Sequence, residues 1–121
     1  MTFQILVAED EAALRDIFVA ELESQYRVTT AANGREALEI LRGTPDIRLL
    51  LSDIRMPEMN GFELAEEALR RDPELKVLFI SAFSDEMPPA SVLKAREIRI
   101  LRKPFGMSKM LELVDEMMSR P

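Results

Sequence analysis

The chain has 121 residues, of which 47% are hydrophobic and 31% are charged, as in one globular domain that buries its own core. The lack of cysteine and histidine excludes disulfide bonds, thiolate and imidazole metal ligands, cysteine nucleophiles and histidine bases. A net charge of −6 argues against nucleic acid as a direct partner. Because the sequence has neither a membrane-spanning run nor a signal-peptide pattern, we expect a cytoplasmic protein with no membrane partner.

Five apolar segments alternate with helical patterns, and this alternation predicts a parallel sheet with crossover helices. We expect strands at residues 3–8, 27–31, 47–52, 76–81 and 98–102, and helices at about residues 11–23, from 33, from 60, 89–96 and 107–119. The second and third helices begin with capping-box patterns, Asn33 with Glu36 and Asn60 with Glu63. Because the prolines at positions 88 and 89 fit only in a first turn, we expect the fourth helix to begin near residue 89.

Strand composition indicates which strands are central. The runs ILVA, LLL and VLFI are continuously apolar, as in strands covered on both faces, whereas RVTTA and IRILR alternate as edge strands do. The second and fifth strands therefore lie outside, which a doubly wound α/β sheet in the order 2-1-3-4-5 with right-handed crossovers satisfies. In such folds, ligands bind beyond the carboxyl ends of the strands, between the first and the third.

Polar side chains gather at that edge. Glu9 and Asp10 follow the first strand, Asp53 follows the third, Ser81 lies at the end of the fourth and Lys103 follows the fifth. Three carboxylates in one crevice repel one another, so we expect a cation among them. Oxygen ligands without histidine or cysteine favour Mg²⁺, or Mn²⁺. A lysine and a hydroxyl beside that metal complete a site for a phosphoryl group, with a carboxylate as the nucleophile.

Each of these residues also has a structural interpretation of its own. Asp10 would fit as the N-cap of the first helix, Asp53 and Ser81 as turn residues, and Lys103 as a solvated strand end. The site is favoured because these separate explanations would have to coincide at the ends of four strands.

Four segments, LVAED, LLLSDIRMPEMNGFEL, VLFISA and LRKPF, resemble the signature segments of the response-regulator receiver domain of two-component signalling, the domain of chemotaxis receivers. The resemblance covers essentially the whole chain, so we expect residues 1–121 to form one receiver domain, either stand-alone or part of a longer protein. It implies a flavodoxin-like fold, with a five-stranded parallel sheet and five helices. Receivers are themselves a standard example of the order 2-1-3-4-5, so that order is not an independent prediction.

The resemblance also implies roles for the acidic residues. Asp53 would accept a phosphoryl group from a phosphohistidine on a histidine kinase or a phosphotransfer protein of a bacterial phosphorelay. Glu9 and Asp10 would hold Mg²⁺, directly or through water, together with Asp53 and the backbone carbonyl of Arg55.

By the same resemblance, Ser81 would contact the phosphoryl group and Lys103 would pair with it, usually before a cis proline. The family's switch aromatic, three residues before that lysine, is Ile100 here, which has no ring to rotate. We therefore expect the phosphorylation signal at Ser81 and Phe83, the nearest aromatic residue. Arg55 and Phe83 would flank the path of the hydrolytic water, and because neither can act as its base, we expect slow autodephosphorylation.

The signal would pass to a downstream output domain or protein. The stretch AREIRIL lacks the acidic and aromatic pattern through which one large DNA-binding subfamily pairs, so we expect a monomer or a weak phosphorylation-dependent dimer. The apolar residues of the last helix span an arc of roughly 160°, wider than one packed face needs. Leu111 and Met118 therefore either belong to a partner surface or pack in the core.

Two other classes of protein stay open. A Mg²⁺-dependent aspartyl phosphatase would use the same residue types, although a haloacid-dehalogenase-like enzyme would carry an Asp-x-Asp pair where this chain has AEDEA. The other alternative is a receiver-like interaction scaffold that is not phosphorylated, although all five site positions carry competent residues. A stable acyl phosphate on Asp53 would favour the receiver, and turnover of a small phosphoester would favour the phosphatase.

Overall fold

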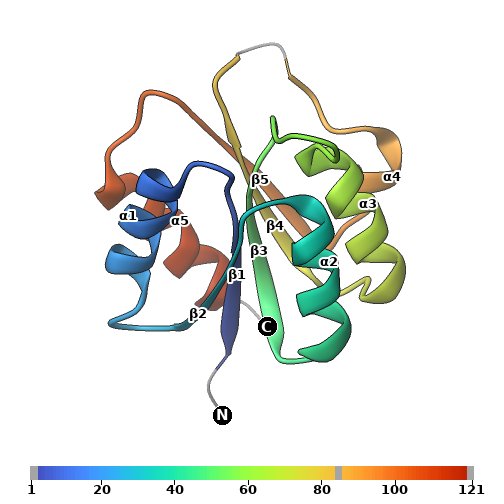
Figure 1. Ribbon diagram of the computed structural model, residues 1–121, viewed down its shortest axis with the longest axis horizontal. Coiled ribbons are helices and arrows are strands. Elements are labelled where there is room, and N and C mark those ends of the chain that lie inside the picture. Colours follow the sequence, from blue (N-terminus) through green and yellow to red (C-terminus); the bar gives the residue numbers. More distant parts are fainter. Residues whose placement is uncertain (1–2, 84–85, 120–121) are drawn as a thin grey trace.

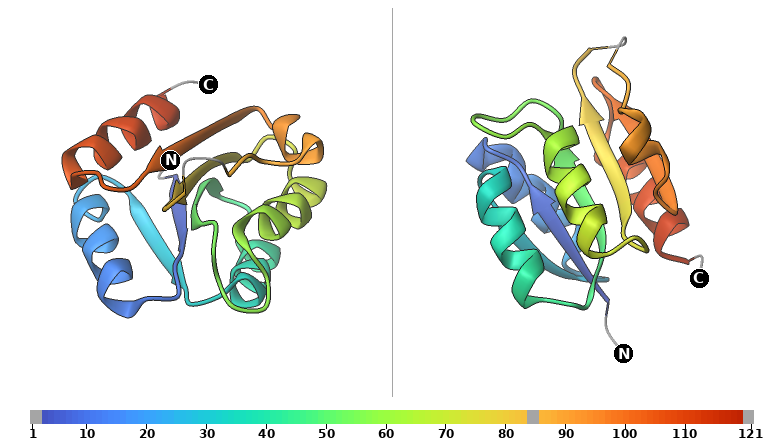
Figure 2. Two further views of the ribbon diagram at one scale, coloured as in Figure 1. Left: turned by 90° about the horizontal axis from the view of Figure 1, so that it is seen from above. Right: turned by 90° about the vertical axis from the view of Figure 1, so that its right-hand side faces the viewer.

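The computed structural model describes residues 3–83 and 86–119, which form a five-stranded parallel sheet between two layers of helices (Figure 1). The strands are β1 (Gln4–Ala8), β2 (Arg27–Ala31), β3 (Ile47–Asp53), β4 (Lys76–Ser81) and β5 (Glu97–Arg102). The helices are α1 (Ala12–Leu22), α2 (Gly34–Gly43), α3 (Gly61–Arg71), α4 (Ala90–Leu93) and α5 (Met107–Ser119). Figure 2 shows α1 and α5 on one face of the sheet and α2, α3 and α4 on the other, which confirms the doubly wound α/β fold.

The strand order β2-β1-β3-β4-β5 confirms the predicted order. All six residues of β4 and four of the five in β1 are buried, because helices cover these strands on both faces. The edge strands β2 and β5 are mostly half-buried. The carboxyl ends of β1, β3, β4 and β5 therefore follow one another along one edge of the sheet, where ligands bind in such folds.

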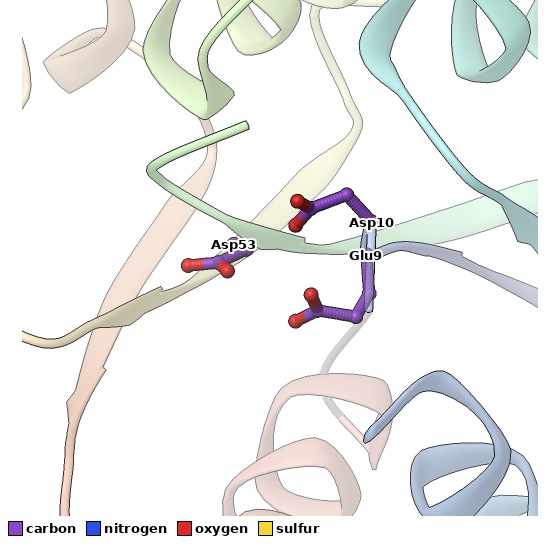
Figure 3. A group of neighbouring side chains, drawn as sticks. All are labelled: Glu9, Asp10 and Asp53. Carbon is purple, nitrogen blue, oxygen red and sulfur yellow. The ribbon is translucent and has the colours of Figure 1, made fainter. Parts of the chain in front are cut away.

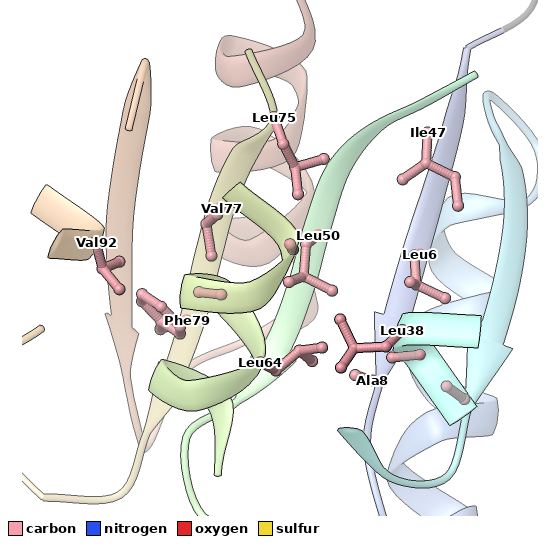
Figure 4. Packing of buried hydrophobic residues seen from close by; sticks show 14 of the residues in the cluster. Leu6, Ala8, Leu38, Ile47, Leu50, Leu64, Leu75, Val77, Phe79 and Val92 are labelled. Carbon is pink, nitrogen blue, oxygen red and sulfur yellow. The ribbon is translucent and has the colours of Figure 1, made fainter. Parts of the chain in front are cut away.

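Alternate residues of the strands point to opposite faces and build two hydrophobic clusters in the described ranges. Leu6 and Leu50 pack with α2, α3 and α4 in one cluster (Figure 4), whereas Ile5 and Leu49 pack with α1 and α5 in the other. Burying one leucine side chain stabilises a fold by about 1.5–3 kcal/mol relative to leaving it exposed. Both helix layers are thus held to the sheet by apolar burial.

The predicted caps open α2 and α3. Asn60 Oδ1 accepts the N–H of Glu63 at 2.9 Å and Glu63 Oε1 accepts the N–H of Asn60 at 3.0 Å, which completes a capping box at α3. At α2, Asn33 accepts the N–H of Glu36 at 2.8 Å, while the Glu36 carboxylate accepts the N–H of Ala32 at 3.3 Å. The sequence signals for these two helix starts are confirmed.

The fourth helix is shorter than predicted. It begins at the expected place, with Pro89 as its N-cap, but it ends at Leu93 and not at residue 96. The reason is that β5 begins one residue earlier than predicted, because Glu97 pairs with Lys76 in the β4–β5 ladder. Residues 94–96 therefore form the turn between α4 and β5. The third strand also runs one residue further than predicted and includes Asp53.

The turn between β3 and α3 folds back onto the end of β3. Gly61 donates its N–H to the Ile54 carbonyl at 2.7 Å, and a Cβ at position 61 would lie 2.4 Å from the Asp53 carbonyl oxygen. Glycine is required here by this close approach of backbone to backbone. In the same turn Glu58 has a φ of 68°, in the left-handed region. The turn thereby holds Asp53 at the edge of the sheet.

The apolar arc of α5 packs into the core. Leu111 and Met118 are half-buried and contact the same cluster as the buried residues of the helix. The buried residues are Met110, Leu113, Val114 and Met117. Core packing, the second of the two alternatives, is thus supported for Leu111 and Met118, while a role of their exposed parts in partner binding stays a prediction. None of the helices in the described ranges is long and apolar enough to cross a membrane.

Candidate functional site

Three carboxylates meet at the carboxyl edge of the sheet. Glu9 and Asp10 follow β1, and Asp53 is the last residue of β3. Each offers one carboxylate oxygen, and these oxygens all lie within 4.8 Å of one another (Figure 3). Glu9 is buried, Asp53 half-buried and Asp10 exposed. The N-cap of α1 is Glu11, so the interpretation of Asp10 as that cap is wrong, and its carboxylate belongs to the acidic cluster.

The carboxyl group of Glu9 has one satisfied oxygen and one unsatisfied oxygen. Its Oε2 accepts the N–H of Glu11 at 3.0 Å, whereas its Oε1 is buried without a hydrogen-bond partner among the described residues. Burial raises the pKa of Glu9 from 4.5 to about 7, and the charges of Asp53 and Asp10 act in the same direction. A buried oxygen in this position is stabilised by a proton or by a cation beside it.

The surroundings of Asp53 shift the pKa of its carboxyl group in opposite directions. Burial is the main cause that raises its pKa, and the charge of Asp10 adds to the effect. The charge of Lys103 is the largest influence that lowers this pKa, followed by hydrogen bonds from the N–H groups of Arg55 and Ile54. The lysine therefore lies close enough for its ammonium to favour the ionised form of Asp53.

Backbone pairing brings Ser81 and Lys103 to the same edge. Asp53 pairs with Ile80 in the β3–β4 register, so Ser81 follows directly beyond it. The Lys103 N–H donates to the Ser81 carbonyl at 2.8 Å, and the Lys103–Pro104 peptide is cis, as the resemblance implied. The predicted site residues thus come from the ends of four adjacent strands.

The acidic donor set fits Mg²⁺ or Mn²⁺. Both metals take oxygen ligands, and Glu9 Oε1, which lacks a hydrogen-bond partner in the part of the chain that the structure describes, is a buried oxygen suited to a cation. Glu9, Asp10 and Asp53 together supply at least three such oxygens within a small volume. The backbone carbonyl of Arg55 as a further ligand stays a prediction.

A fourth carboxylate, which was not predicted, reaches Ser81. Glu86 Oε1 accepts the Ser81 hydroxyl at 2.6 Å, and Glu86 Oε2 lies 3.2 Å from Nε of Arg55. The Arg55 guanidinium lies over the ring of Phe83, 4.3 Å from its centre. Glu86 lies five residues beyond Ser81 in a stretch without helical or strand periodicity, so no pattern in the sequence indicates this contact.

The two predicted switch positions differ in burial. Ile100 is half-buried in β5, pairs with Phe79 and packs against the cluster formed with α2, α3 and α4. Phe83 is 47% exposed and contacts Arg55. The exposed ring of Phe83 can change its surroundings at a lower cost in free energy than the packed side chain of Ile100. The role of Phe83 in signalling stays a prediction.

The fold and its edge define a class of protein, an α/β domain that gathers an aspartate, acidic metal ligands, a hydroxyl and a lysine for phosphoryl chemistry. A sequence model of the response regulator receiver domain matches residues 5–115. The chain therefore belongs to the response regulator receiver domain family. It is a phosphoacceptor signalling module of two-component systems, not a conventional enzyme.

Similar proteins come from bacteria. The response regulator receiver protein CpdR of Brucella abortus is 39% identical over 116 residues, which cover 95% of this chain and 96% of CpdR. The sensor kinase CckA of the same organism is 33% identical over 118 residues, which cover 96% of this chain and 12% of the kinase. The crystal structure of the response regulator TrrA from Thermotoga maritima, in complex with Mg²⁺-BeF, is 31% identical, with a TM-score of 0.81 over 96% of this chain and 99% of TrrA.

Proposed function

We propose that Asp53 accepts a phosphoryl group from a phosphohistidine on a histidine kinase or a phosphotransfer protein, and that the modified domain signals to a downstream output domain or protein. The observation that supports this most directly is the cluster of Glu9, Asp10 and Asp53 oxygens within 4.8 Å of one another. Lys103 provides the cation beside Asp53 that a phosphoryl acceptor needs.

In this reaction a carboxylate oxygen of Asp53 forms a bond to phosphorus while the bond from phosphorus to the donor imidazole nitrogen breaks, and the departing imidazole takes up a proton. Lys103 stabilises the charge on the phosphoryl oxygens, and Ser81 donates its hydroxyl hydrogen to one of them. In this function the domain catalyses only its own phosphorylation and dephosphorylation.

Bound Mg²⁺, or Mn²⁺, supplies charge neutralisation for the phosphoryl group. Glu9, Asp10, Asp53 and the backbone carbonyl of Arg55 would hold the metal. Because the pKa of Glu9 is raised to about 7, metal binding displaces a proton from this carboxyl at lower pH, and metal affinity falls as pH decreases below that value.

The signal would leave the site through Ser81 and Phe83. Arg55 and Phe83 are both exposed beside the site, and neither offers a base for the hydrolytic water, so the acyl phosphate would be long-lived. We further propose a cytoplasmic location and a monomer, or a weak dimer that depends on phosphorylation.

Acetyl phosphate with Mg²⁺ tests the proposal without a partner protein. We expect one phosphoryl adduct in the intact mass of the unmodified chain and none in Asp53→Asn, while Asp46→Asn, a matched change at an exposed aspartate, keeps the adduct. An adduct that survives Asp53→Asn would identify a different acceptor. Turnover of a small phosphoester without a stable adduct would favour the aspartyl phosphatase. Neither an adduct nor turnover would favour the interaction scaffold.

A further inference from the structure

The Ser81 hydroxyl has more acceptors than hydrogens. Its Oγ lies 2.6 Å from Glu86 Oε1 and 2.6 Å from the Phe83 carbonyl oxygen, and it accepts the N–H of Phe83 at 3.1 Å. A serine hydroxyl has one hydrogen and donates to one acceptor at a time. The Phe83 carbonyl already accepts a hydrogen bond from Arg102 at 3.0 Å, and ionised acceptors form the stronger hydrogen bonds. Glu86 is therefore the acceptor of the Ser81 hydrogen.

The Glu86 carboxylate is held against this hydroxyl. Its side chain is 12% exposed, and its second oxygen lies 3.2 Å from Nε of Arg55, whose side chain is 66% exposed. Ser81 itself is fully buried. One anion thus joins a buried hydroxyl at the end of β4 to an arginine two residues beyond Asp53.

We propose that Glu86 is a positioning residue that acts through Ser81 and restrains phosphorylation of Asp53. The inference rests on the proposed function, in which Ser81 donates to a phosphoryl oxygen. In the unphosphorylated chain that hydrogen is committed to Glu86, so the hydroxyl must turn away from Glu86 when the phosphoryl group arrives. Glu86 and the phosphoryl group are both anionic acceptors, and they compete for the one hydroxyl hydrogen of Ser81.

Removal of the Glu86 charge is therefore expected to favour phosphorylation. Glu86→Gln keeps the size of the side chain but makes it a weaker acceptor. With subsaturating acetyl phosphate and Mg²⁺, we expect the rate of adduct formation to rise about fivefold, equivalent to about 1 kcal/mol in the barrier. The affinity for beryllofluoride in the presence of Mg²⁺ should increase by a similar factor, because its fluorine atoms would occupy the place of the phosphoryl oxygens.

A double-mutant cycle with Ser81→Ala separates an effect through the hydroxyl from a general effect of charge. In the Ser81→Ala background, Glu86→Gln should leave the rate unchanged, because no hydroxyl remains to be released. Glu39→Gln removes the same charge from an exposed position of α2 and should behave as the unmodified chain does. Glu86→Ala removes the acceptor altogether and should also accelerate adduct formation. This variant takes the place of Glu86→Gln in the cycle if Glu86→Gln does not fold.

The possible results are distinct. A rate in the Glu86 variants equal to or below that of the unmodified chain overturns the inference. An equal gain in the Ser81→Ala background also overturns it, because the charge would then act without the hydroxyl. If the unmodified chain forms no adduct at all, the proposed function fails as well, whereas an adduct without a Glu86 effect removes this inference alone.

Discussion

Glu9 makes the stability of the metal-free protein depend on pH. The pKa of Glu9 is raised from 4.5 to about 7, by burial first and then by the charges of Asp53 and Asp10. Between these values the folded state binds more protons than the unfolded chain, so the free energy of unfolding falls as pH rises through this window. At about 1.36 kcal/mol per pKa unit the whole effect is about 3 kcal/mol, and solvent at the rim of the site screens it to about 1–2 kcal/mol.

Glu9→Gln removes this titration and keeps the shape of the side chain. Urea denaturation with a metal chelator, at several values between pH ~4 and ~8, measures the free energy of unfolding of both proteins. Relative to Glu9→Gln, the unmodified chain should lose about 1–2 kcal/mol as pH rises across that range. The control Glu39→Gln, in which an exposed glutamate is changed, should follow the unmodified chain.

Mg²⁺ provides the complementary half of this experiment. At 100 times its Kd, a ligand of the folded state adds about 2.7 kcal/mol to the free energy of unfolding. The unmodified chain should gain this stabilisation near neutral pH, and Glu9→Gln should gain much less. A stability difference between the two proteins that does not change with pH, or that changes in the opposite direction, would refute the argument that a buried Glu9 carboxyl titrates in this window.

Three further predictions follow from the local geometry. Gly61→Ala should destabilise the fold by about 1–3 kcal/mol and weaken Mg²⁺ binding, because the added Cβ would displace the Asp53 carbonyl. The control Gly43→Ala, whose Cβ would meet nothing within 4 Å among the described residues, should have neither effect. Equal thermal midpoints of the two variants would contradict this prediction. Asn60→Ala should cost about 1 kcal/mol in urea denaturation through loss of the capping box, and an unchanged midpoint would count against the box. Phe83→Glu should shorten the acyl-phosphate lifetime, because the glutamate adds a base. A switch role of Phe83 would be excluded by unchanged lifetimes in Phe83→Glu and Phe83→Ala together with no NMR shift around Phe83 on beryllofluoride binding.

The parts of the site that follow from strand pairing could be predicted from the sequence. Continuous apolar runs mark β1, β3 and β4 as central, and a residue that directly follows such a run must lie at the carboxyl edge of the sheet. Glu9 and Ser81 directly follow such runs, and Asp53 follows the run LLL after one intervening residue, so the rule locates all three at this edge. The N-caps of α2 and α3 were also predictable, because in each helix the side chain of the cap residue accepts the N–H three positions further along the chain.

Contacts made by irregular segments could not be predicted in this way. Glu86 reaches Ser81 across a loop whose path depends on tertiary packing, so spacing along the chain carries no information about it. The end of α4 at Leu93 was missed because pairing of Glu97 with Lys76 overrides the local helical pattern. The N-cap interpretation of Asp10 was wrong by one residue, since α1 begins after Glu11.

The location of the acyl phosphate tests the central claim most directly. After treatment with acetyl phosphate and Mg²⁺, borohydride reduction converts a phosphorylated aspartate to homoserine, which peptide mass spectrometry identifies by position. Trypsin cleaves after Arg48 and Arg55, and the peptide between them contains Asp53 as its sole carboxylate side chain. We predict homoserine at position 53 in this peptide. Two results would contradict Asp53 as the acceptor: homoserine in the N-terminal tryptic peptide that carries Glu9 and Asp10, or an unreduced 49–55 peptide from a phosphorylated chain.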